Sequence, residues 1–217
     1  MKAKITLIVI SIMATLPLFS QEIEISFYGN YVFDDSFDSY FDRGAYYDGK
    51  IKGGGQWGVG AEYLAHEYTG VELIYIRQDT SSPTYYQFYD SYFPQGQFTE
   101  FDLAINYIML GGVRHYRKQN SPIEGFGGLM AGMVIANIDN PDNGNNDSTT
   151  KFSWGAKLGL TYWASSNFGI KLQTQLLSAV QAMGGGLYFS GYGVSTGVSS
   201  YSTIYQFSLG GGIVFKP

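Results

Sequence analysis

The stretch that decides the fold is Ser202-Thr-Ile-Tyr-Gln-Phe-Ser-Leu-Gly-Gly-Gly-Ile-Val-Phe215. Its odd-numbered positions make one largely apolar face, formed by Tyr205, Phe207, Leu209, Gly211, Ile213 and Phe215. Its even-numbered positions make a face of small or polar residues, formed by Gln206, Ser208, Gly210, Gly212 and Val214. Because side chains alternate between the two faces of a strand, this pattern predicts a β-strand with one apolar face.

The composition is typical of many such strands in a membrane, and not of a soluble helical enzyme. Of the 217 residues, 17% are aromatic, 14% are charged and 29 are glycine. The net charge of −5 and the lack of a basic patch indicate that nucleic acid is not a partner. The absence of cysteine excludes a lipoprotein anchor, disulfides and thiol chemistry.

Residues 1–20 have the features of a secretory signal peptide. Lys2 and Lys4 give a positive start, and residues 5–18 form an apolar run that is too short to span a membrane comfortably. We expect cleavage before Gln21, which leaves 21–217 as the mature domain. The alternative is a membrane anchor that is retained.

Strand-like alternation recurs along the whole mature chain, which has no other long apolar run. The segments are 23–33, 56–63, 70–76, 101–109, 123–135, 152–162, 168–176 and 202–215. The connections between them alternate between short turns (65–68, 117–122, 165–167) and long loops (34–51, 80–97, 137–149, 181–201). Since only helices and closed barrels satisfy the backbone in lipid, the predicted fold is all-β: an eight-stranded antiparallel up-and-down transmembrane β-barrel.

The aromatic residues predict which face of each strand meets lipid. We expect odd-numbered residues to face lipid in the first four strands and the last, and even-numbered residues in the sixth and seventh; the fifth, apolar on both faces, stays undecided. One aromatic belt, near the loops, would contain Tyr31, Phe33, Trp57, Tyr75, Phe101, Phe152, Trp154 and Tyr205. The other, near the turns, would contain Tyr63, Tyr162, Phe168 and Phe215. A soluble barrel of lipocalin size, the alternative, would have its aromatic residues inside.

Four strand motifs carry a resemblance to known proteins. They are Val71-Glu-Leu-Ile-Tyr-Ile-Arg-Gln-Asp79, Phe101-Asp-Leu-Ala-Ile-Asn-Tyr-Ile-Met-Leu-Gly-Gly112, Lys171-Leu-Gln-Thr-Gln-Leu-Leu177 and Ile204-Tyr-Gln-Phe-Ser-Leu-Gly-Gly-Gly-Ile-Val-Phe215. On these motifs the chain resembles small outer-membrane β-barrel proteins of Bacteroidota-type Gram-negative bacteria, and more loosely the OmpX and OmpA-barrel class. The resemblance implies an outer-membrane location with the loops extracellular, and it implies no reaction.

The C-terminus resembles the signal by which outer-membrane barrels are recognised for insertion. Ser208, Gly210, Ile213 and Phe215 match its polar-x-Gly-x-x-apolar-x-aromatic form, although Lys216 and Pro217 follow here where the usual form stops. This resemblance implies the barrel-assembly machinery as a partner, alongside outer-membrane lipid and lipopolysaccharide.

Catalytic and metal-binding residues are scarce in the sequence. A lipid-modifying or proteolytic barrel enzyme needs a nucleophile and a base near the outer leaflet, whereas His66 and His115 both fall at the turns. Asp139-Asn-Pro-Asp-Asn-Gly144 resembles a calcium loop but fails at the ligand positions Pro141 and Thr150. We therefore expect no enzyme, no cofactor and no metal site.

Four charged residues are expected inside the barrel. Glu62 and Glu72 should lie side by side, and Lys157 and Lys171, symmetric about Ala164, should lie on the opposite wall. Because lone charges in a narrow interior are costly, we expect the four to meet across the lumen and block it. The alternative is four separate hydrated charges. A pore is not expected, since side chains fill an eight-stranded barrel.

The long loops are the expected site of any surface role. Asp35, Asp38 and Asp42 make the first loop acidic, and Tyr85, Tyr86 and Tyr89 offer an aromatic surface in the second. The predicted function is a closed, non-enzymatic barrel with a structural, adhesion or binding role at the cell surface. The alternative is an accessory subunit of a larger outer-membrane secretion or transport machine.

Overall fold

The computed structural model describes residues 23–42, 45–88, 96–142, 144, 146–180, 186–190, 193–197 and 204–217. For 37–42, 45–47, 86–88, 180, 186–190, 193–197 and 204 it describes the backbone alone. The expected signal peptide and cleavage point fall outside these ranges. Among the residues described, no helix is long and apolar enough to cross a membrane.

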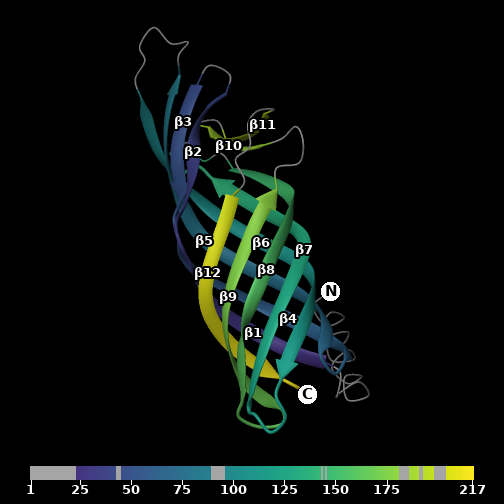
Figure 1. The fold of residues 1–217 in the computed structure, drawn as a ribbon. Coiled ribbons are helices and arrows are strands. Elements are labelled where there is room, and N and C mark those ends of the chain that lie inside the picture. Colours follow the sequence, from purple (N-terminus) through teal and green to yellow (C-terminus); the bar gives the residue numbers. More distant parts are fainter. Residues whose placement is uncertain are drawn as a thin grey trace, which may run out of the picture.

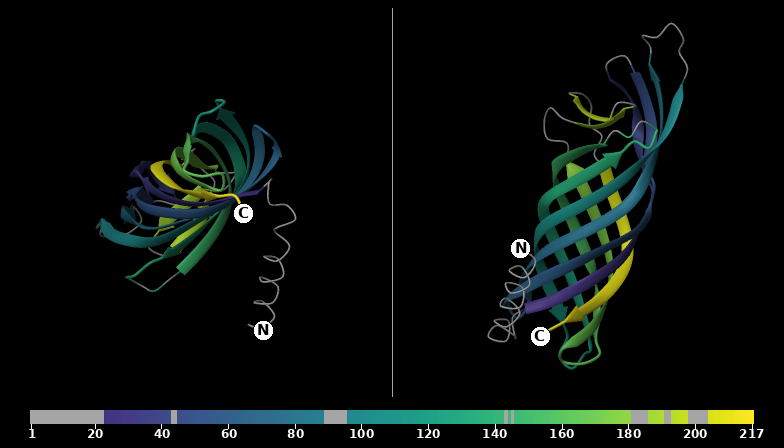
Figure 2. Two further views of the ribbon diagram at one scale, coloured as in Figure 1. Left: turned by 90° about the horizontal axis from the view of Figure 1, so that it is seen from below. Right: turned by 180° about the vertical axis from the view of Figure 1, so that it is seen from behind.

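Eight antiparallel strands close into a barrel, as the sequence predicts (Figures 1 and 2). They are β1 (Ile23–Val32), β4 (Gly54–His66), β5 (Thr69–Phe88), β6 (Gln97–Arg117), β7 (Ile123–Asp139), β8 (Asn146–Trp163), β9 (Phe168–Val180) and β12 (Ile204–Phe215). Each pairs with its neighbour in this order, and β12 pairs with β1 to complete the ring. The closed ring leaves no unpaired strand edge within the barrel, as a membrane requires.

The two ends of the barrel differ. At the turn end, residues 67–68, 118–122 and 164–167 connect the strands, close to the predicted turns. At the opposite loop end, two predicted loops contain further strands. The first holds β2 (Asp35–Asp42) and β3 (Ala45–Ile51), and the last holds the separate hairpin of β10 (Gly186–Ser190) and β11 (Gly193–Gly197).

One side of the barrel wall continues far past the loop end. β5 has 20 residues and β6 has 21, about twice the 9–11 that a membrane strand needs. Beyond the ring, β2 pairs with β3, β3 with β5, and β5 with β6. These four strands form a sheet, here called the extension, that stands above the rim in Figure 1.

A bend joins the barrel to the extension and is fixed by Asp34. Lys50 donates to Asp34 Oδ2 at 2.8 Å, and the backbone N of Gly53 donates to its Oδ1 at 2.8 Å. These two hydrogen bonds hold the pKa of Asp34 below its ordinary value. A side chain on Gly53 would meet the backbone N of Asp34 at 2.9 Å, so glycine lets the two strands approach at the bend.

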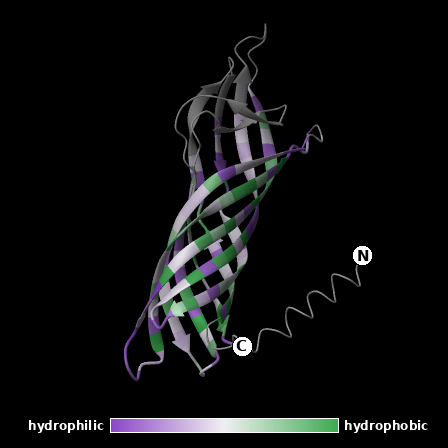
Figure 3. Cartoon of the chain, turned by 90° about the vertical axis from the view of Figure 1, so that its right-hand side faces the viewer, coloured by the Kyte–Doolittle hydropathy of each residue, from purple (hydrophilic) through white to green (hydrophobic). Residues whose placement is uncertain are grey.

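Most strands face lipid as predicted. Odd-numbered residues are outward in β1, β4, β5 and β12, and even-numbered residues are outward in β8 and β9. Figure 3 shows hydrophobic and hydrophilic positions interspersed along the strands of the barrel wall, with further hydrophilic positions at the turns. Of the expected belts, Tyr31, Phe33, Trp57, Phe152, Trp154 and Tyr205 are exposed near the loop end, and Tyr63, Tyr162, Phe168 and Phe215 near the turn end.

The predicted orientation of the fourth barrel strand, β6, is wrong. Its odd-numbered residues Phe101, Leu103, Ile105, Tyr107 and Met109 are buried inside the barrel. Apolar residues stand at both parities here, with Ile108 and Leu110 exposed outside, so aromatic position alone does not fix the face. The pairing with β5 fixes the face of β6, because it places Leu110 opposite Leu73, which faces outward.

The interior has a charged part near the turn end and an apolar core beyond it. In β7, which the sequence left undecided, the even-numbered Glu124, Phe126, Met130 and Val134 point inward. The apolar core includes Ile74, Ile76, Phe101, Leu103, Ile105, Tyr107, Met109, Met130, Val134, Ile138 and Leu177.

Candidate functional site

Three carboxylates form a row across neighbouring strands inside the turn end. Glu24 of β1 pairs in register with Glu62 of β4, and Glu62 pairs with Glu72 of β5. Each of the three is at most 1% exposed. Like charges directly opposite one another are destabilising, and buried charges are costly, so each carboxylate requires a donor.

Glu72 receives its donors from across the lumen. The Lys157 ammonium, on β8, forms an ion pair with Glu72 Oε2, and the Tyr28 hydroxyl donates to Oε1. Lys157 and Tyr28 are themselves buried. The structure therefore brings two of the four predicted lumen residues together in a contact that spans the barrel.

The other two predicted lumen residues, Glu62 and Lys171, do not bind each other. Lys171 donates to Ser26 Oγ at 2.9 Å, and its ammonium lies 5.2 Å from the centre of the Phe126 ring. The expected symmetry about Ala164 is wrong, because the turn spans 164–167 and pairs Lys171 with Thr161. Lys157 therefore lies four residues further toward the loop end, roughly 13 Å along the strand.

The partner of Glu62 is His115 and not one of the two lysines. Its Nε2 lies 2.7 Å from Glu62 Oε1, and its Nδ1 lies 2.5 Å from Glu124 Oε1. Glu124 also accepts hydrogen bonds from Arg117 and, at 3.0 Å, from the Trp163 indole. Sequence reasoning missed this contact because it placed His115 at a turn, whereas β6 continues to Arg117 and carries His115 inside the barrel.

The His115 network is not the arrangement of a nucleophile and its base. A general base needs a ring nitrogen within reach of the proton that it removes, and carboxylates occupy both nitrogens here. His66 is exposed at the turn end, as predicted. Both histidines line a cavity of about 380 Å³ at that end, together with Glu24, Leu64, Ala65, Glu67, Arg117, Glu124 and Lys216.

A second set of contacts crosses the lumen closer to the loop end. The Tyr107 hydroxyl donates to Gln206 Oε1 at 2.7 Å, and Gln206 Nε2 donates to Gln78 Oε1 at 2.8 Å. The three residues come from β6, β12 and β5, and all are buried. Together with the Glu72–Lys157 ion pair, they fill the interior at two levels.

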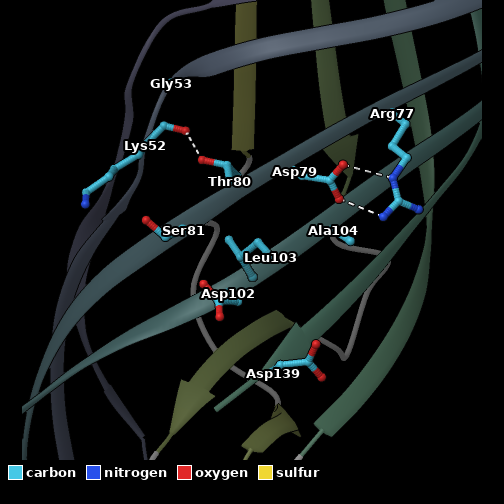
Figure 4. Close-up of a pocket in the computed structure, with 10 residues that line it drawn as sticks. All are labelled: Lys52, Gly53, Arg77, Asp79, Thr80, Ser81, Asp102, Leu103, Ala104 and Asp139. Atoms are coloured by element: carbon cyan, nitrogen blue, oxygen red, sulfur yellow. Dashed lines mark hydrogen bonds and ion pairs between the residues drawn. The ribbon is translucent and has the colours of Figure 1, made fainter. Parts of the chain in front are cut away.

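A groove lies on the outside of the barrel wall, just beyond the aromatic belt of the loop end (Figure 4). Its volume is about 580 Å³. This outer groove is lined by Lys52, Gly53, Arg77, Asp79, Thr80, Ser81, Asp102, Leu103, Ala104 and Asp139. β5, β6 and β7 form its floor, and the bend between β3 and β4 forms one side.

Two ion pairs and two further carboxylates make the outer groove polar. Arg77 binds Asp79 through two hydrogen bonds of 3.1 and 2.7 Å, drawn in Figure 4. Lys52 binds Glu100, in the extension, at 2.5 Å, and Ser81 donates to the same carboxylate at 2.6 Å. Donation from Lys52 and Ser81 holds the pKa of Glu100 below its ordinary value.

Asp102 and Asp139 lie directly opposite each other on β6 and β7, and both are exposed. No ion pair joins either of them to a described cation. The sequence missed the groove because the predicted face of β6 placed Asp102 inside. In the described part of the chain, no group of three or more His, Cys, Asp or Glu residues could hold a metal ion.

The expected loop residues are only partly described. Asp35 is half-buried and accepts a hydrogen bond of 2.9 Å from the backbone of Tyr205. Asp38, Asp42 and Tyr86 are described by their backbone alone, and Tyr89 lies outside the described residues. Tyr85 is 62% exposed, and its ring lies 4.7 Å from that of Phe98, which is 49% exposed.

No protein-family model matches the sequence, and no curated protein matches it. The solved structures that share the fold include three with a TM-score above 0.5. Neisserial surface protein A has a TM-score of 0.55 and 15% identity, covering 90% of this chain and 97% of that one. The outer membrane protein OprG from Pseudomonas aeruginosa has a TM-score of 0.53 and 16% identity, covering 90% and 96%. The outer membrane protease OmpT from Escherichia coli has a TM-score of 0.52 and 9% identity, covering 91% and 97%.

Identities this low show a shared fold and nothing more specific. The fold is that of integral outer-membrane β-barrels, which agrees with the aromatic belts and the closed ring.

Proposed function

We propose that the chain is a non-enzymatic, closed barrel of the outer membrane that presents its loop end outside the cell for a structural, adhesion or binding role. The observation that carries the proposal is the extension, a four-stranded sheet that continues past the ring. The strand motifs support placing it with the small barrels of Bacteroidota-type bacteria.

The extension has the features of a contact surface. Tyr85 and Phe98 are paired across β5 and β6 and are both exposed, ten residues beyond the belt residue Tyr75 along β5. At this distance from the belt the two rings do not serve to anchor the barrel in lipid. Exposed aromatic residues are enriched in protein–protein interfaces, which supports a binding role.

The filled interior supports a barrel that does not conduct. The Glu72–Lys157 ion pair and the Tyr107–Gln206–Gln78 contacts span the lumen at separate levels. Reconstitution of the purified protein into planar bilayers should give no ion-conductance steps. Regular conductance steps from the folded protein would contradict a closed barrel.

The direction of the barrel can be tested on living cells, because the chain has no cysteine of its own. A membrane-impermeant maleimide should label Tyr85→Cys on intact cells. The matched control is His66→Cys, exposed at the turn end, which should be labelled only after the outer membrane is permeabilised. Labelling of His66→Cys and not of Tyr85→Cys on intact cells would overturn the proposed surface role.

A further inference from the structure

The outer groove begins where the aromatic belt of the loop end stops. Trp57 is the strand partner of Arg77, and its ring lies 5.7 Å from the ring of Tyr75. Tryptophan and tyrosine side chains of a belt lie at the level of the lipid headgroups. Arg77 and the residues that follow it on β5 therefore lie beside the headgroups, outside the hydrocarbon.

The charges of the outer groove are ordered by depth. Arg77 is nearest to the hydrocarbon, and Asp79 follows two residues later on β5. Four residues beyond Arg77, Ser81 has Asp102 as its strand partner on β6, and Asp102 in turn has Asp139 as its strand partner on β7. The Lys52–Glu100 ion pair closes the outermost side. From the membrane outward, a headgroup in this groove would meet a guanidinium first and then the carboxylates.

Both kinds of charge can still bind a ligand. A guanidinium has five N–H donors, and Arg77 uses three of them, two on Asp79 and one on Asn106 at 3.4 Å. The exposed Asp102 and Asp139 face each other, and like charges in this position are destabilising. An ammonium bound between them would relieve their repulsion while leaving the Arg77–Asp79 pair intact.

We propose that the outer groove holds the headgroup of one membrane lipid that carries both a phosphate and a primary ammonium, as in the phosphoethanolamine class. In such a lipid the phosphate lies nearer to the hydrocarbon than the ammonium does. The phosphate accepts hydrogen bonds from the two remaining donors of Arg77, and the ammonium donates to Asp102 and Asp139. These are charge-assisted hydrogen bonds, stronger than those between neutral groups.

The same chemistry rejects two related headgroups. A quaternary ammonium, as in phosphatidylcholine, has no N–H to donate to Asp102 or Asp139. The headgroup of phosphatidylglycerol carries a negative charge and no ammonium, so it meets the two carboxylates without compensation. The groove should therefore discriminate between lipids that have identical acyl chains.

Native mass spectrometry tests the proposal. The folded protein is mixed in detergent with equal amounts of phosphatidylethanolamine, phosphatidylcholine and phosphatidylglycerol, and the lipids that stay bound after release from the detergent are identified by mass. The population carrying one bound phosphatidylethanolamine should exceed each of the others about three-fold, the scale of an exposed ion pair. Asp102→Asn with Asp139→Asn should reduce this ratio to about one. Arg77→Gln should lower binding of phosphatidylethanolamine as well.

The matched control is Glu67→Gln, which removes one exposed carboxylate at the turn end and should leave the ratio unchanged. The shift in gel mobility on heating shows that each variant is folded. Equal binding of the three lipids, stronger binding of phosphatidylglycerol, or a preference that survives in the double Asp variant would each overturn the proposal.

Discussion

At the scale of single residues, the Glu72–Lys157 ion pair is the most sharply defined contact inside the barrel. Both side chains are buried, and the Tyr28 hydroxyl donates to the remaining oxygen of Glu72. The Coulomb attraction of a buried pair is offset by desolvation, so the pair adds little net stability. Loss of one partner is costly, because it leaves an uncompensated charge inside.

A double-mutant cycle measures this dependence. Glu72→Gln and Lys157→Met should each lower the free energy of unfolding by about 3 kcal/mol. The double variant should lose less than the sum, with a coupling of about 1–3 kcal/mol in urea unfolding from vesicles. The matched cycle uses Glu62→Gln and Lys171→Met, because Glu62 and Lys171 do not bind each other. Their two losses of unfolding free energy should be additive. Additive losses for Glu72 and Lys157 would show that no pair crosses the lumen.

Inward glycines provide the space that these large side chains occupy. A side chain on Gly60 would lie 2.5 Å from Glu72 Oε1 and 2.9 Å from the Tyr28 hydroxyl. Gly60→Ala should therefore lower the free energy of unfolding by about 1–3 kcal/mol. Gly29→Ala is the control, since a side chain there has no neighbour within 4 Å, and it should change stability by less than about 0.5 kcal/mol. Equal effects of the two substitutions would contradict this role for Gly60.

At the scale of the strands, the sequence predicts a face correctly where only one parity is apolar. In β4, Trp57 and Tyr63 alternate with Gln56, Gly58 and Glu62, so one residue of slip would bury the wrong set. In β6, residues 105–110 are mostly apolar at both parities, and local pattern gives no answer. The face of β6 depends on pairing with β5, a tertiary property.

The predicted lumen site is likewise correct where local sequence decides the position of a residue, and incorrect where the position depends on the turn or the strand pairing. Glu62 and Glu72 are opposite each other as predicted, because the turn between β4 and β5 is short. Lys157 and Lys171 are not opposite each other. The turn between their strands spans residues 164–167, so the hairpin is centred beyond Ala164, and Lys171 pairs with Thr161. The His115 contact with Glu62 could not be predicted, since it required the face of β6.

Thiol labelling tests the face of β6 directly. A cysteine in place of Leu110, which is 57% exposed, should react with a lipid-phase maleimide in vesicles. A cysteine in place of Ile105, which is 5% exposed, should not react. Leu73→Cys, on the outward partner of Leu110, serves as the positive control. Labelling at 105 without labelling at 110 would restore the orientation expected from the sequence.

At the scale of the whole molecule, the barrel depends on the seam between β1 and β12. Beyond the strand pairs of this seam, Lys216 forms an ion pair with Glu24 at 2.8 Å, and its ammonium lies 4.1 Å from the centre of the Trp163 ring. Its backbone N also donates to Asn167 O at 2.8 Å. The residue that follows the usual terminal aromatic thus connects the seam to the turn between β8 and β9.

Lys216→Ala should weaken the seam. The substitution leaves the buried Glu24 without its cation, so the free energy of unfolding should fall by about 2 kcal/mol. On gels, the band of the folded barrel should convert to the band of the unfolded chain at a lower temperature. Lys118→Ala, an exposed lysine in a turn, is the control and should change stability by less than about 0.5 kcal/mol. If Lys216→Ala and the control unfold at the same midpoint temperature, Lys216 does not contribute to closure of the barrel.

The pairing of β1 with β12 also constrains when the molecule can assemble. Ile25 pairs with Phe215, so β1 finds its partner only after the whole of the barrel sequence between them has been synthesised. Until those residues arrive, β1 has an open edge, and such an edge pairs readily with other chains. Contacts between distant parts of a chain also form slowly. The barrel therefore cannot close before β12 has been made, and the chain must be protected from aggregation until β12 reaches its place beside β1.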